Sequence, residues 1–321
     1  MTFDFYSFRF VFSALDTIAF PSGQPGNLLR GAFGNAFRGI VCPSNCPGAR
    51  LCPTRASCDY ARIFEPTREE PIREEPTREG PTGEEPTGEP ASTTSGPSGL
   101  RDRPRPFVFR AAYLDGKTIQ PQERFWFDVN LFETRNPPLD SFAQAFGRLA
   151  KQGIGPRRGR SDLVSVEQRS ISISLAPKSE ETRTIRVEFV TPTELKSGDQ
   201  LVARPEFDVL FARSRDRVST LRALFGAGPL EIDFRAMGQR AGAVRMTHCE
   251  LRQVDATRRS SRTGQVHGIG GFVGLAEYAG DLGEFIPYLE IAQWTGIGRQ
   301  CVWGKGELRV AKFATELVPN V

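Results

Sequence analysis

Four cysteines near the N-terminus have a spacing that suits metal binding. Cys42, Cys46, Cys52 and Cys58 form the pattern C-x3-C-x5-C-x5-C on a segment rich in proline and glycine. Four thiolates on a loop too small to bury a core are typical of a closed, tetrahedral zinc site. An iron–sulfur cluster would also take four cysteines, and a loop of unmetallated thiols is the third interpretation. We expect structural zinc here and no catalytic metal, because four protein ligands leave no open position.

A second pattern lies near the C-terminus, where glycine is repeated around two cations. Residues 296–306 read GIGRQCVWGKG, so two Gly-x-Gly units stand five residues apart, with Arg299 and Lys305 inside the run. Glycine lets backbone N–H groups approach a phosphate closely, and the two cations add positive charge there. A plain turn between a helix and a strand is the competing interpretation. The residues of this loop that we predict to bind phosphate are Gly296, Gly298, Arg299, Gly304, Lys305 and Gly306.

Arginines gather in two further segments that have the character of loops. The members are Arg157, Arg158 and Arg160 in the first, and Arg258, Arg259 and Arg262 in the second. Arginine makes bidentate contacts with phosphate and stacks on bases. Each cluster alone is more typical of a solvated surface. Together with Arg299 and Lys305, the two clusters predict one RNA-binding face across both halves of the chain.

The charge balance supports a polyanionic partner. The 321 residues carry a net charge of +4, but nine Glu and three Arg give residues 65–90 a charge of −6 and leave +10 for the rest. A field of this size suits phosphate backbones, since counterion release drives such binding. No apolar run reaches the ~18 residues of a membrane helix, and the first residues do not have the pattern of a signal peptide. We expect a cytoplasmic protein with reduced thiols and no membrane contact, in which Cys249 and Cys301 are buried.

Residues 65–104 differ from everything around them. They begin EPTREEPIREEPTREG, a repeat with proline at every fifth position, and continue with serine, threonine, glycine and proline. Proline removes backbone donors and blocks helix formation, and Ile72 is the one apolar residue of the repeat that could be buried. We expect a disordered, extended insertion with polyproline II character and no chemical role.

The remaining sequence predicts an α+β protein with two tandem domains of one design. Apolar residues alternate in the strand-like segments, as Phe8, Phe10 and Phe12 do. In the first half we expect strands at 8–12, 107–113, 124–132 and 163–175 and helices at 138–150 and at 27–40, the latter begun by Asn27. In the second half we expect strands at 183–190, 248–254, 271–279 and 301–310 and helices at 207–225 and 287–295. Both orders follow the ferredoxin-like (RRM-like) pattern. We place the N-terminal domain at 1–178, with the Cys loop 42–58 and the insertion, and the C-terminal domain at 179–321, with the glycine-rich loop.

The stretch from Val254 to Val310 resembles the C-terminal half of the CRISPR-associated, repeat-processing endoribonucleases of the RAMP superfamily. The segments that carry the resemblance are Arg258-Arg259-Ser260-Ser261-Arg262, Gly270-Gly271-Phe272-Val273-Gly274, Leu289-Glu290-Ile291-Ala292-Gln293-Trp294 and the glycine-rich loop. The loop keeps the family's Gly-hydrophobic-Gly spacing and departs from it at Lys305. Near the N-terminus, further family motifs are matched by Leu29-Arg30-Gly31, Cys58-Asp59-Tyr60 and Phe64-Glu65. The resemblance covers both halves except the insertion.

The resemblance implies an endoribonuclease that binds CRISPR repeat RNA and cuts precursor transcripts to guide RNA without a catalytic metal. A base would activate the 2′-hydroxyl beside the scissile phosphate, and the products would be a 2′,3′-cyclic phosphate and a 5′-hydroxyl. Many members carry a catalytic histidine on or near the first helix, which has none here. His267, in the arginine-rich loop, is our candidate base, whereas His248 lies in an alternating strand and is more typical of a structural residue. Arg38 and Tyr6 complete the predicted catalytic set, and Arg30 is expected to contact RNA.

Two other functions remain open. The missing histidine of the first helix favours a catalytically inactive RAMP subunit that binds guide RNA inside a CRISPR effector complex. The glycine-rich loop and the likeness over both halves favour the enzyme. The third function is that of a metal-binding interaction protein built around the Cys loop, which would show no steep salt dependence of RNA affinity.

Overall fold

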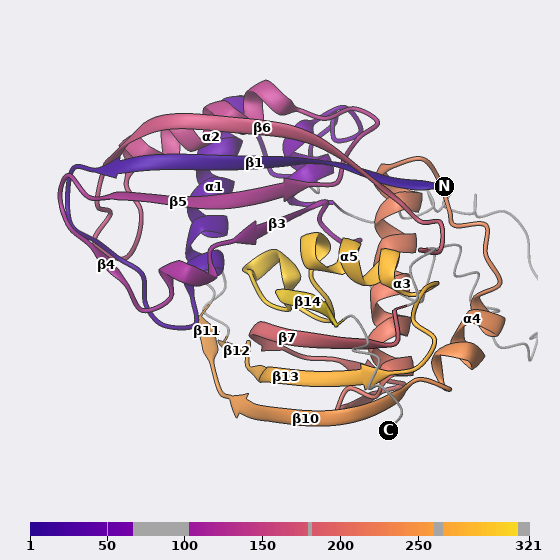
Figure 1. Cartoon of the computed structure of the whole chain (residues 1–321). Coiled ribbons are helices and arrows are strands. Elements are labelled where there is room, and N and C mark those ends of the chain that lie inside the picture. The colour runs from indigo at the N-terminus through magenta and orange to yellow at the C-terminus, as the bar shows by residue number, and fades with distance from the viewer. Residues whose placement is uncertain (50, 67–102, 179–181, 260–265, 314–321) are drawn as a thin grey trace, which may run out of the picture.

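The computed structural model describes residues 1–49, 51–66, 103–178, 182–259 and 266–313. These residues fold into two four-stranded antiparallel sheets with helices packed against them (Figure 1). The predicted insertion at 65–104 falls almost entirely on residues 67–102, outside the described part of the chain. No helix among the described residues is long and apolar enough to cross a membrane.

The first half is a ferredoxin-like domain. Its elements are strand β1 (Thr2–Ala14), helix α1 (Pro25–Val41), strands β3 (Phe107–Arg110) and β5 (Arg124–Leu131), helix α2 (Leu139–Gln152) and strand β6 (Ser161–Ser174). The sheet order β3-β5-β1-β6, with antiparallel neighbours throughout, is that of the split βαβ fold. Two short strands, β2 (Ile18–Ala19) and β4 (Thr118–Ile119), pair with each other, and a π-helical turn, η1 (Tyr60–Phe64), follows the cysteines.

The second half repeats the design. Its elements are strand β7 (Thr184–Thr193), helix α3 (Phe207–Phe225), strands β10 (Arg245–Val254) and β13 (Gly271–Ala279), helix α5 (Ile286–Thr295) and strand β14 (Leu308–Phe313). The sheet order is β10-β13-β7-β14. Added to this frame are helix α4 (Phe234–Ala241) and the hairpins β8–β9 (Lys196–Ser197 with Gln200–Leu201) and β11–β12 (Thr257–Arg259 with Val266–Gly268). The predicted fold class, two tandem ferredoxin-like domains, is confirmed.

Two sequence-based expectations about local structure are wrong. Helix α1 begins at Pro25 with Gln24 at the N-cap, not at Asn27, because proline presets the helical φ angle at the first position and needs no hydrogen-bond partner there. Cys249 is only half-buried, since β10 is an edge strand, whereas Cys301 is buried as expected.

The expected strand at 301–310 is also wrong in its first half. Gln300 and Gly304 have left-handed φ angles of 66° and 78°, which bend the chain into a 3-10 turn, η4 (Cys301–Trp303). Extended backbone begins only at Leu308. The aromatic and β-branched residues of this segment therefore belong to a turn, because the backbone conformation on either side of them excludes a strand.

Strand β1 contributes to two hydrophobic cores, because successive side chains of a strand point to opposite faces. Phe8, Phe10 and Phe12 lie on one face and pack in the core formed with α1 and α2. Phe3 and Phe5 lie on the other face and pack in the core of the C-terminal domain. All five rings are at most 2% exposed. Helices α3 and α5 therefore lie between the two sheets, as Figure 1 shows.

The C-terminal end of α5 is held by two side chains from the N-terminal domain and by Arg217 of α3. The contacts are Arg110 Nη2 to the Gln293 and Trp294 carbonyls at 3.0 and 2.9 Å, Asn130 Nδ2 to the Trp294 carbonyl at 2.9 Å, and Arg217 Nε to the Thr295 carbonyl at 2.9 Å. The last carbonyls of a helix have no partner within it, and cations there also complement the helix dipole. Burial lowers the pKa of Arg110, and nearby Glu307 opposes this.

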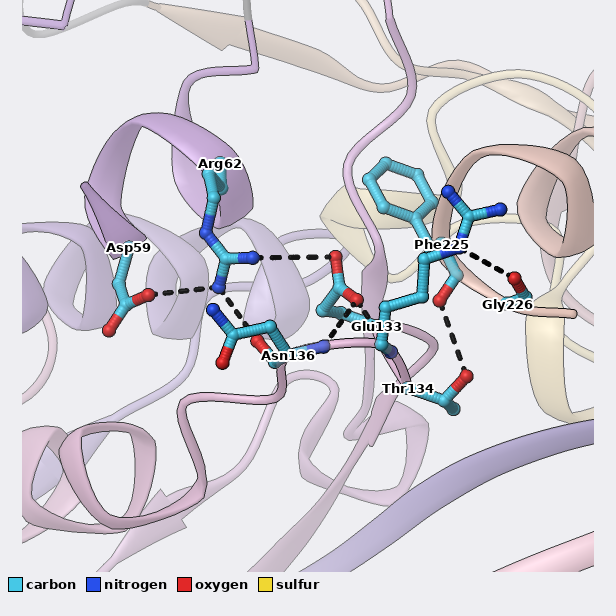
Figure 2. Close-up of polar contacts among 8 residues, drawn as sticks. Asp59, Arg62, Glu133, Thr134, Asn136, Phe225 and Gly226 are labelled. Atoms are coloured by element: carbon cyan, nitrogen blue, oxygen red, sulfur yellow. Dashed lines mark hydrogen bonds and ion pairs between the residues drawn. The ribbon is translucent and has the colours of Figure 1, made fainter. Parts of the chain in front are cut away.

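The end of α3 is held in the same way (Figure 2). Thr134 Oγ1 donates to the Phe225 carbonyl at 3.3 Å, and Arg135 donates to the Gly226 carbonyl at 2.7 Å and the Ala223 carbonyl at 2.9 Å. Glu133, which is 5% exposed, orders this segment by accepting from the backbone amides of Arg135 and Asn136. Arg62, from η1, donates to the Asn136 carbonyl and lies 3.9 Å from the Glu133 carboxylate. The turn after β5 therefore joins α3 to the segment that follows the cysteines.

The substitution Arg110→Met tests the contact at α5. It keeps the apolar volume but leaves two enclosed carbonyls with fewer donors, so we expect a loss of about 2–4 kcal/mol in the free energy of unfolding, measured by urea denaturation. Arg186→Met is the matched control, because Arg186 pairs with Glu277 at a side-chain exposure of 47% and should contribute less than about 1 kcal/mol. Equal losses in the two variants would contradict the role assigned to Arg110.

Candidate functional site

The glycine-rich loop, residues 296–306, directly follows α5 and is folded tightly on itself. Ile297 donates its amide to the Gly306 carbonyl at 2.9 Å, and Gly306 donates to the Pro192 carbonyl at 3.1 Å. A Cβ at Gly298 or Gly306 would lie 2.3 Å from the Glu194 carbonyl or 2.0 Å from the Ile297 carbonyl, and both residues have positive φ. These glycines are thus required by close backbone packing, and the amides named here already donate to protein carbonyls.

Both cations of the loop are engaged by the protein itself. Lys305 is 3% exposed, and its Nζ donates to the Gly23 carbonyl at 2.8 Å. Burial lowers the pKa of Lys305, partly offset by the charge of Asp115. Arg299 forms an ion pair with Glu194. The sequence-based expectation of two phosphate-facing cations is therefore corrected for Lys305, because its ammonium group is used to join the loop to the turn before α1.

The first turn of α1 packs directly on the loop, and a cleft opens beside this contact. A Cβ at Gly26 would lie 2.8 Å from both Gly304 Cα and the Trp303 carbonyl, so no larger residue fits between helix and loop. The cleft has a volume of about 230 Å³. Its chemically distinctive lining residues are Tyr113 and Asp115 of the N-terminal domain and Trp303, Lys305 and Arg309 of the C-terminal domain.

The β11–β12 hairpin is anchored at the same place. Gln300 Nε2 donates to the Gly268 carbonyl at 2.9 Å, and a Cβ at Gly23 would lie 3.6 Å from Ala256 Cβ. The backbone register sets His267 opposite Arg258 and Val266 opposite Arg259. The side chains of these four residues, and Arg262 as a whole, lie outside the described part of the chain. The backbone therefore carries His267 and two of the predicted arginines close to the loop and to the N-terminus of α1.

The first arginine cluster lies on a tight turn between α2 and β6. Arg157 and Arg158 are exposed, and Arg160 pairs with Asp16 at 2.9 Å. A Cβ at Gly159 would lie 2.6 Å from the Thr17 carbonyl, so this turn packs on the segment that leads to β2 and then to Gly23. All three arginines are thus exposed, on a turn that packs against the chain segment leading toward the cleft.

The other predicted site residues of the N-terminal domain are placed elsewhere. Arg38 is near the end of α1, roughly 18 Å along the helix from Gly26 at 1.5 Å per residue, and donates to the Cys46 carbonyl at 3.0 Å. Tyr6 is half-buried on the side of β1 that packs on the helices. The guanidinium of Arg30 lies 4.6 Å from the centre of the Phe64 ring. Neither Arg38 nor Tyr6 lines the cleft.

The four thiols of the Cys loop lie beside one another. Cys42 contacts Cys46 and Cys58, and Cys52 contacts the same two residues. Burial and the neighbouring thiols raise the pKa of Cys42, whereas the Thr54 hydroxyl lowers that of Cys52. As placed, no three His, Cys, Asp or Glu side chains among the described residues form a group that could hold a metal ion.

Sequence reasoning missed three residues of this region: Arg110, Tyr113 and Arg309. Arg309 alternates with the apolar Leu308 and Val310, so its place on the open face of the sheet could have been predicted. Arg110 follows three apolar residues at the end of a strand, and a cation in that position indicates a partner within the fold. For Tyr113, which lies in a 3-10 turn, we find no comparable signal.

Comparisons with known proteins agree across the chain. Residues 3–186 match the family model AF_1859_N, an N-terminal domain, and residues 187–308 match the model of the CRISPR-associated endoribonuclease Cas6. A search of curated proteins found no match.

Solved structures of the Cas6 type share the fold. A Cas6 product complex superposes with a TM-score of 0.55 at 12% identity, covering 95% of this chain and 98% of that one. Thermus thermophilus Cas6 gives 0.52 at 11% identity, with coverage of 97% and 99%. A partial Cas6-RT-Cas1–Cas2 complex gives 0.55 at 10% identity and covers 97% of this chain and 46% of that one. At these identities the likeness concerns the fold alone.

Two glycines of α1 test the contact between helix and loop. Gly26→Ala adds a methyl group where 2.8 Å is available, so we expect it to displace the loop and to lower the free energy of unfolding by about 1–3 kcal/mol. Gly31→Ala, in the same helix with nothing within 4 Å of the added carbon, should instead stabilise by about 0.5–1 kcal/mol. Urea denaturation measures both, and amide exchange at 296–306 should be faster in Gly26→Ala alone. Stabilisation by both substitutions would show that the contact is looser than described.

Proposed function

Because the chain belongs to the Cas6 family of CRISPR-associated endoribonucleases in the RAMP superfamily, we propose that it binds CRISPR repeat RNA and cuts precursor transcripts into guide RNA for a CRISPR effector complex. The observation that carries this proposal is the meeting of three segments next to one cleft, which the first two of them line. They are the glycine-rich loop, the N-terminus of α1 and the anchored base of the hairpin that contains His267. The +10 charge outside residues 65–90 supports a polyanionic substrate.

The proposed chemistry is metal-independent transfer of the scissile phosphate. His267 removes the proton of the 2′-hydroxyl, and this oxygen attacks the adjacent phosphorus in line. The bond to the 5′-oxygen breaks, and that oxygen takes up a proton. The products are a 2′,3′-cyclic phosphate and a 5′-hydroxyl. An imidazole suits both proton transfers, since its ordinary pKa is about 6.5. Arginines of the hairpin and Arg309 at the cleft supply positive charge where the pentacovalent phosphate is most negative.

Cleavage of the labelled repeat RNA in EDTA tests this chemistry. We expect a cut that a 2′-deoxy substitution at the cut site abolishes, because it removes the nucleophile. His267→Ala should lower the single-turnover rate about 10²- to 10⁴-fold. His248→Ala is the matched control: this other histidine is 52% exposed on the edge strand β10 and should leave the rate unchanged.

Three outcomes would change the proposal. Cleavage that survives His267→Ala keeps the enzyme and removes its assigned base. Cleavage that needs a divalent metal overturns the mechanism. Tight, salt-sensitive binding without cleavage would indicate a guide-RNA-binding subunit.

We further propose that Cys42, Cys46, Cys52 and Cys58 bind a structural zinc ion. The nearness of Cys42 and of Cys52 to both Cys46 and Cys58, on a loop where Ala49 is the one buried apolar residue described between Cys42 and Cys58, supports this. The thiols do not form a metal-holding group as placed, so the side chains must close around the ion. Such a site would have a structural role, because four protein ligands leave no position for substrate.

Metal analysis of the purified protein tests the zinc proposal. We expect about one zinc per chain, its loss in Cys46→Ser, and a lowered Tm in that variant, because metal binding contributes to folding. Cys249→Ser, which removes a thiol far from the loop in sequence, should keep the metal. A metal-free wild-type protein, or iron in place of zinc, would refute the proposal.

A further inference from the structure

Two aromatic rings form a stacked pair on the open part of the N-terminal sheet. The rings of Tyr113 and Trp126 have centroids 4.3 Å apart and planes inclined by 20°. The Tyr113 hydroxyl also accepts from the Trp126 amide and donates to its carbonyl, so the pair is held by polar contacts as well as by stacking. Trp126 nevertheless remains 41% exposed, which is high for an indole. The hydrogen bonds of Tyr113 thus fix a half-exposed aromatic surface that a ligand can reach.

The position of this surface relates it to the cleft. Trp126 pairs with Val11 in the sheet, and Arg110 pairs with Asp128, two residues from Trp126 on the same face. Arg110 holds the end of α5, so the sheet face that carries Trp126 also makes the contact between the two domains. Tyr113 itself lines the cleft. The aromatic pair therefore stands at the rim of the proposed site.

Three cations lie near the pair, two of them ion-paired with carboxylates. Lys117 Nζ lies 4.9 Å from the centre of the Tyr113 ring. Arg9, on the neighbouring strand, forms two hydrogen bonds of 2.8 and 2.9 Å with Asp128 and is 46% exposed. Arg309 lines the same cleft as Tyr113, is 65% exposed, and is 3.4 Å from Glu188. An aromatic surface with lysine and arginine at its edges fits a flat, anionic ligand better than an apolar protein segment.

We propose that Trp126 and Tyr113 form a stacking subsite for an unpaired nucleotide of the bound RNA, with Lys117 beside its phosphate. This rests on the proposed function, because it assumes that the substrate is RNA. A base within a duplex has both faces covered by its neighbours, so the subsite selects single-stranded RNA next to the cut site. Stacking is available to every base, and the subsite is therefore tolerant of sequence. It gives the sheet face a role in substrate binding that is separate from the chemistry at the hairpin.

Affinity measurements on two RNAs test the subsite. The first RNA is the repeat with its single-stranded flanks, and the second is a blunt duplex of the same length. Trp126→Ala should weaken binding of the first roughly 5- to 150-fold, the range for loss of one base stack, and leave the duplex unaffected. Trp126→Phe keeps an aromatic face and should stay within about 3-fold of wild type. Lys117→Gln should lower the salt dependence of log Kd by about one.

Phe234→Ala is the matched control for loss of an exposed ring under a cation. Phe234 is 37% exposed on α4, with the guanidinium of Arg215 4.9 Å from its centre, and its loss should not change RNA affinity. Trp126 fluorescence, taken as wild type minus Trp126→Phe, should be quenched by the single-stranded RNA. This signal would not be produced by a merely structural role.

Two failures of this test are distinguishable. If the wild-type protein binds neither RNA, the proposed function itself fails. If the folded Trp126→Ala variant binds the flanked RNA as the wild type does, the function stands and the subsite is refuted, leaving this face for a protein contact. Circular dichroism shows whether the Trp126→Ala variant is folded. If it is unfolded, Trp126→Phe and the fluorescence difference decide instead, and absence of quenching refutes the subsite.

Discussion

The carbonyl groups at the C-terminal ends of α3 and α5 are the point on which the arrangement of the two domains depends. A helix leaves its last carbonyls without internal partners, and here the partners come largely from the other domain. A hydrogen bond from a charged donor contributes about 1.5–3 kcal/mol, and an enclosed carbonyl without a donor costs about 1–3 kcal/mol. These contacts are directional, unlike the apolar packing around them. They therefore determine the angle and the register at which α3 and α5 lie against the first sheet.

The proposed site inherits its geometry from this arrangement. The glycine-rich loop directly follows the Trp294 and Thr295 carbonyls, which Arg110 of the N-terminal domain and Arg217 of α3 hold, so its starting point is set in part by the domain contact. The loop is closed by backbone hydrogen bonds within itself and packs against the first turn of α1. Lys305 holds the turn before that helix by a hydrogen bond. The loop is a structural centre that positions other segments. The RNA contacts that we propose therefore fall to groups at its border, namely the hairpin, Arg309 and the aromatic rim.

The sequence predicted the frame of the molecule well, because that frame depends on local periodicity. Helix α3 matches the range expected from its apolar spacing, and the alternation of Phe8, Phe10 and Phe12 identified the central strand. What it did not predict depends on contacts between distant residues. The turn at Cys301–Trp303 follows from left-handed backbone at Gln300, a residue with no intrinsic preference for it. The burial of Lys305 depends on a carbonyl 282 positions away, which no spacing rule reveals. Likewise, Arg38 is of a residue type common in RNA-binding sites, but its hydrogen bond to the Cys46 carbonyl makes it a support for the Cys loop.

The division of β1 between two cores has a consequence for the order in which the chain can mature on the ribosome. All strands of the first domain have been synthesised once the chain reaches Ser174. Phe3, Phe5, Val108 and Phe132 are buried only after α3 and α5 have been synthesised and have packed against them. At translation rates of about 5–20 residues per second, the roughly 120 residues that separate Ser174 from the end of α5 take on the order of 6–24 seconds to synthesise. During that interval the nascent chain exposes these four apolar side chains, and transiently exposed apolar surface makes a folding intermediate prone to aggregation. The first domain therefore completes the packing of its second sheet face only after the C-terminal domain has been synthesised.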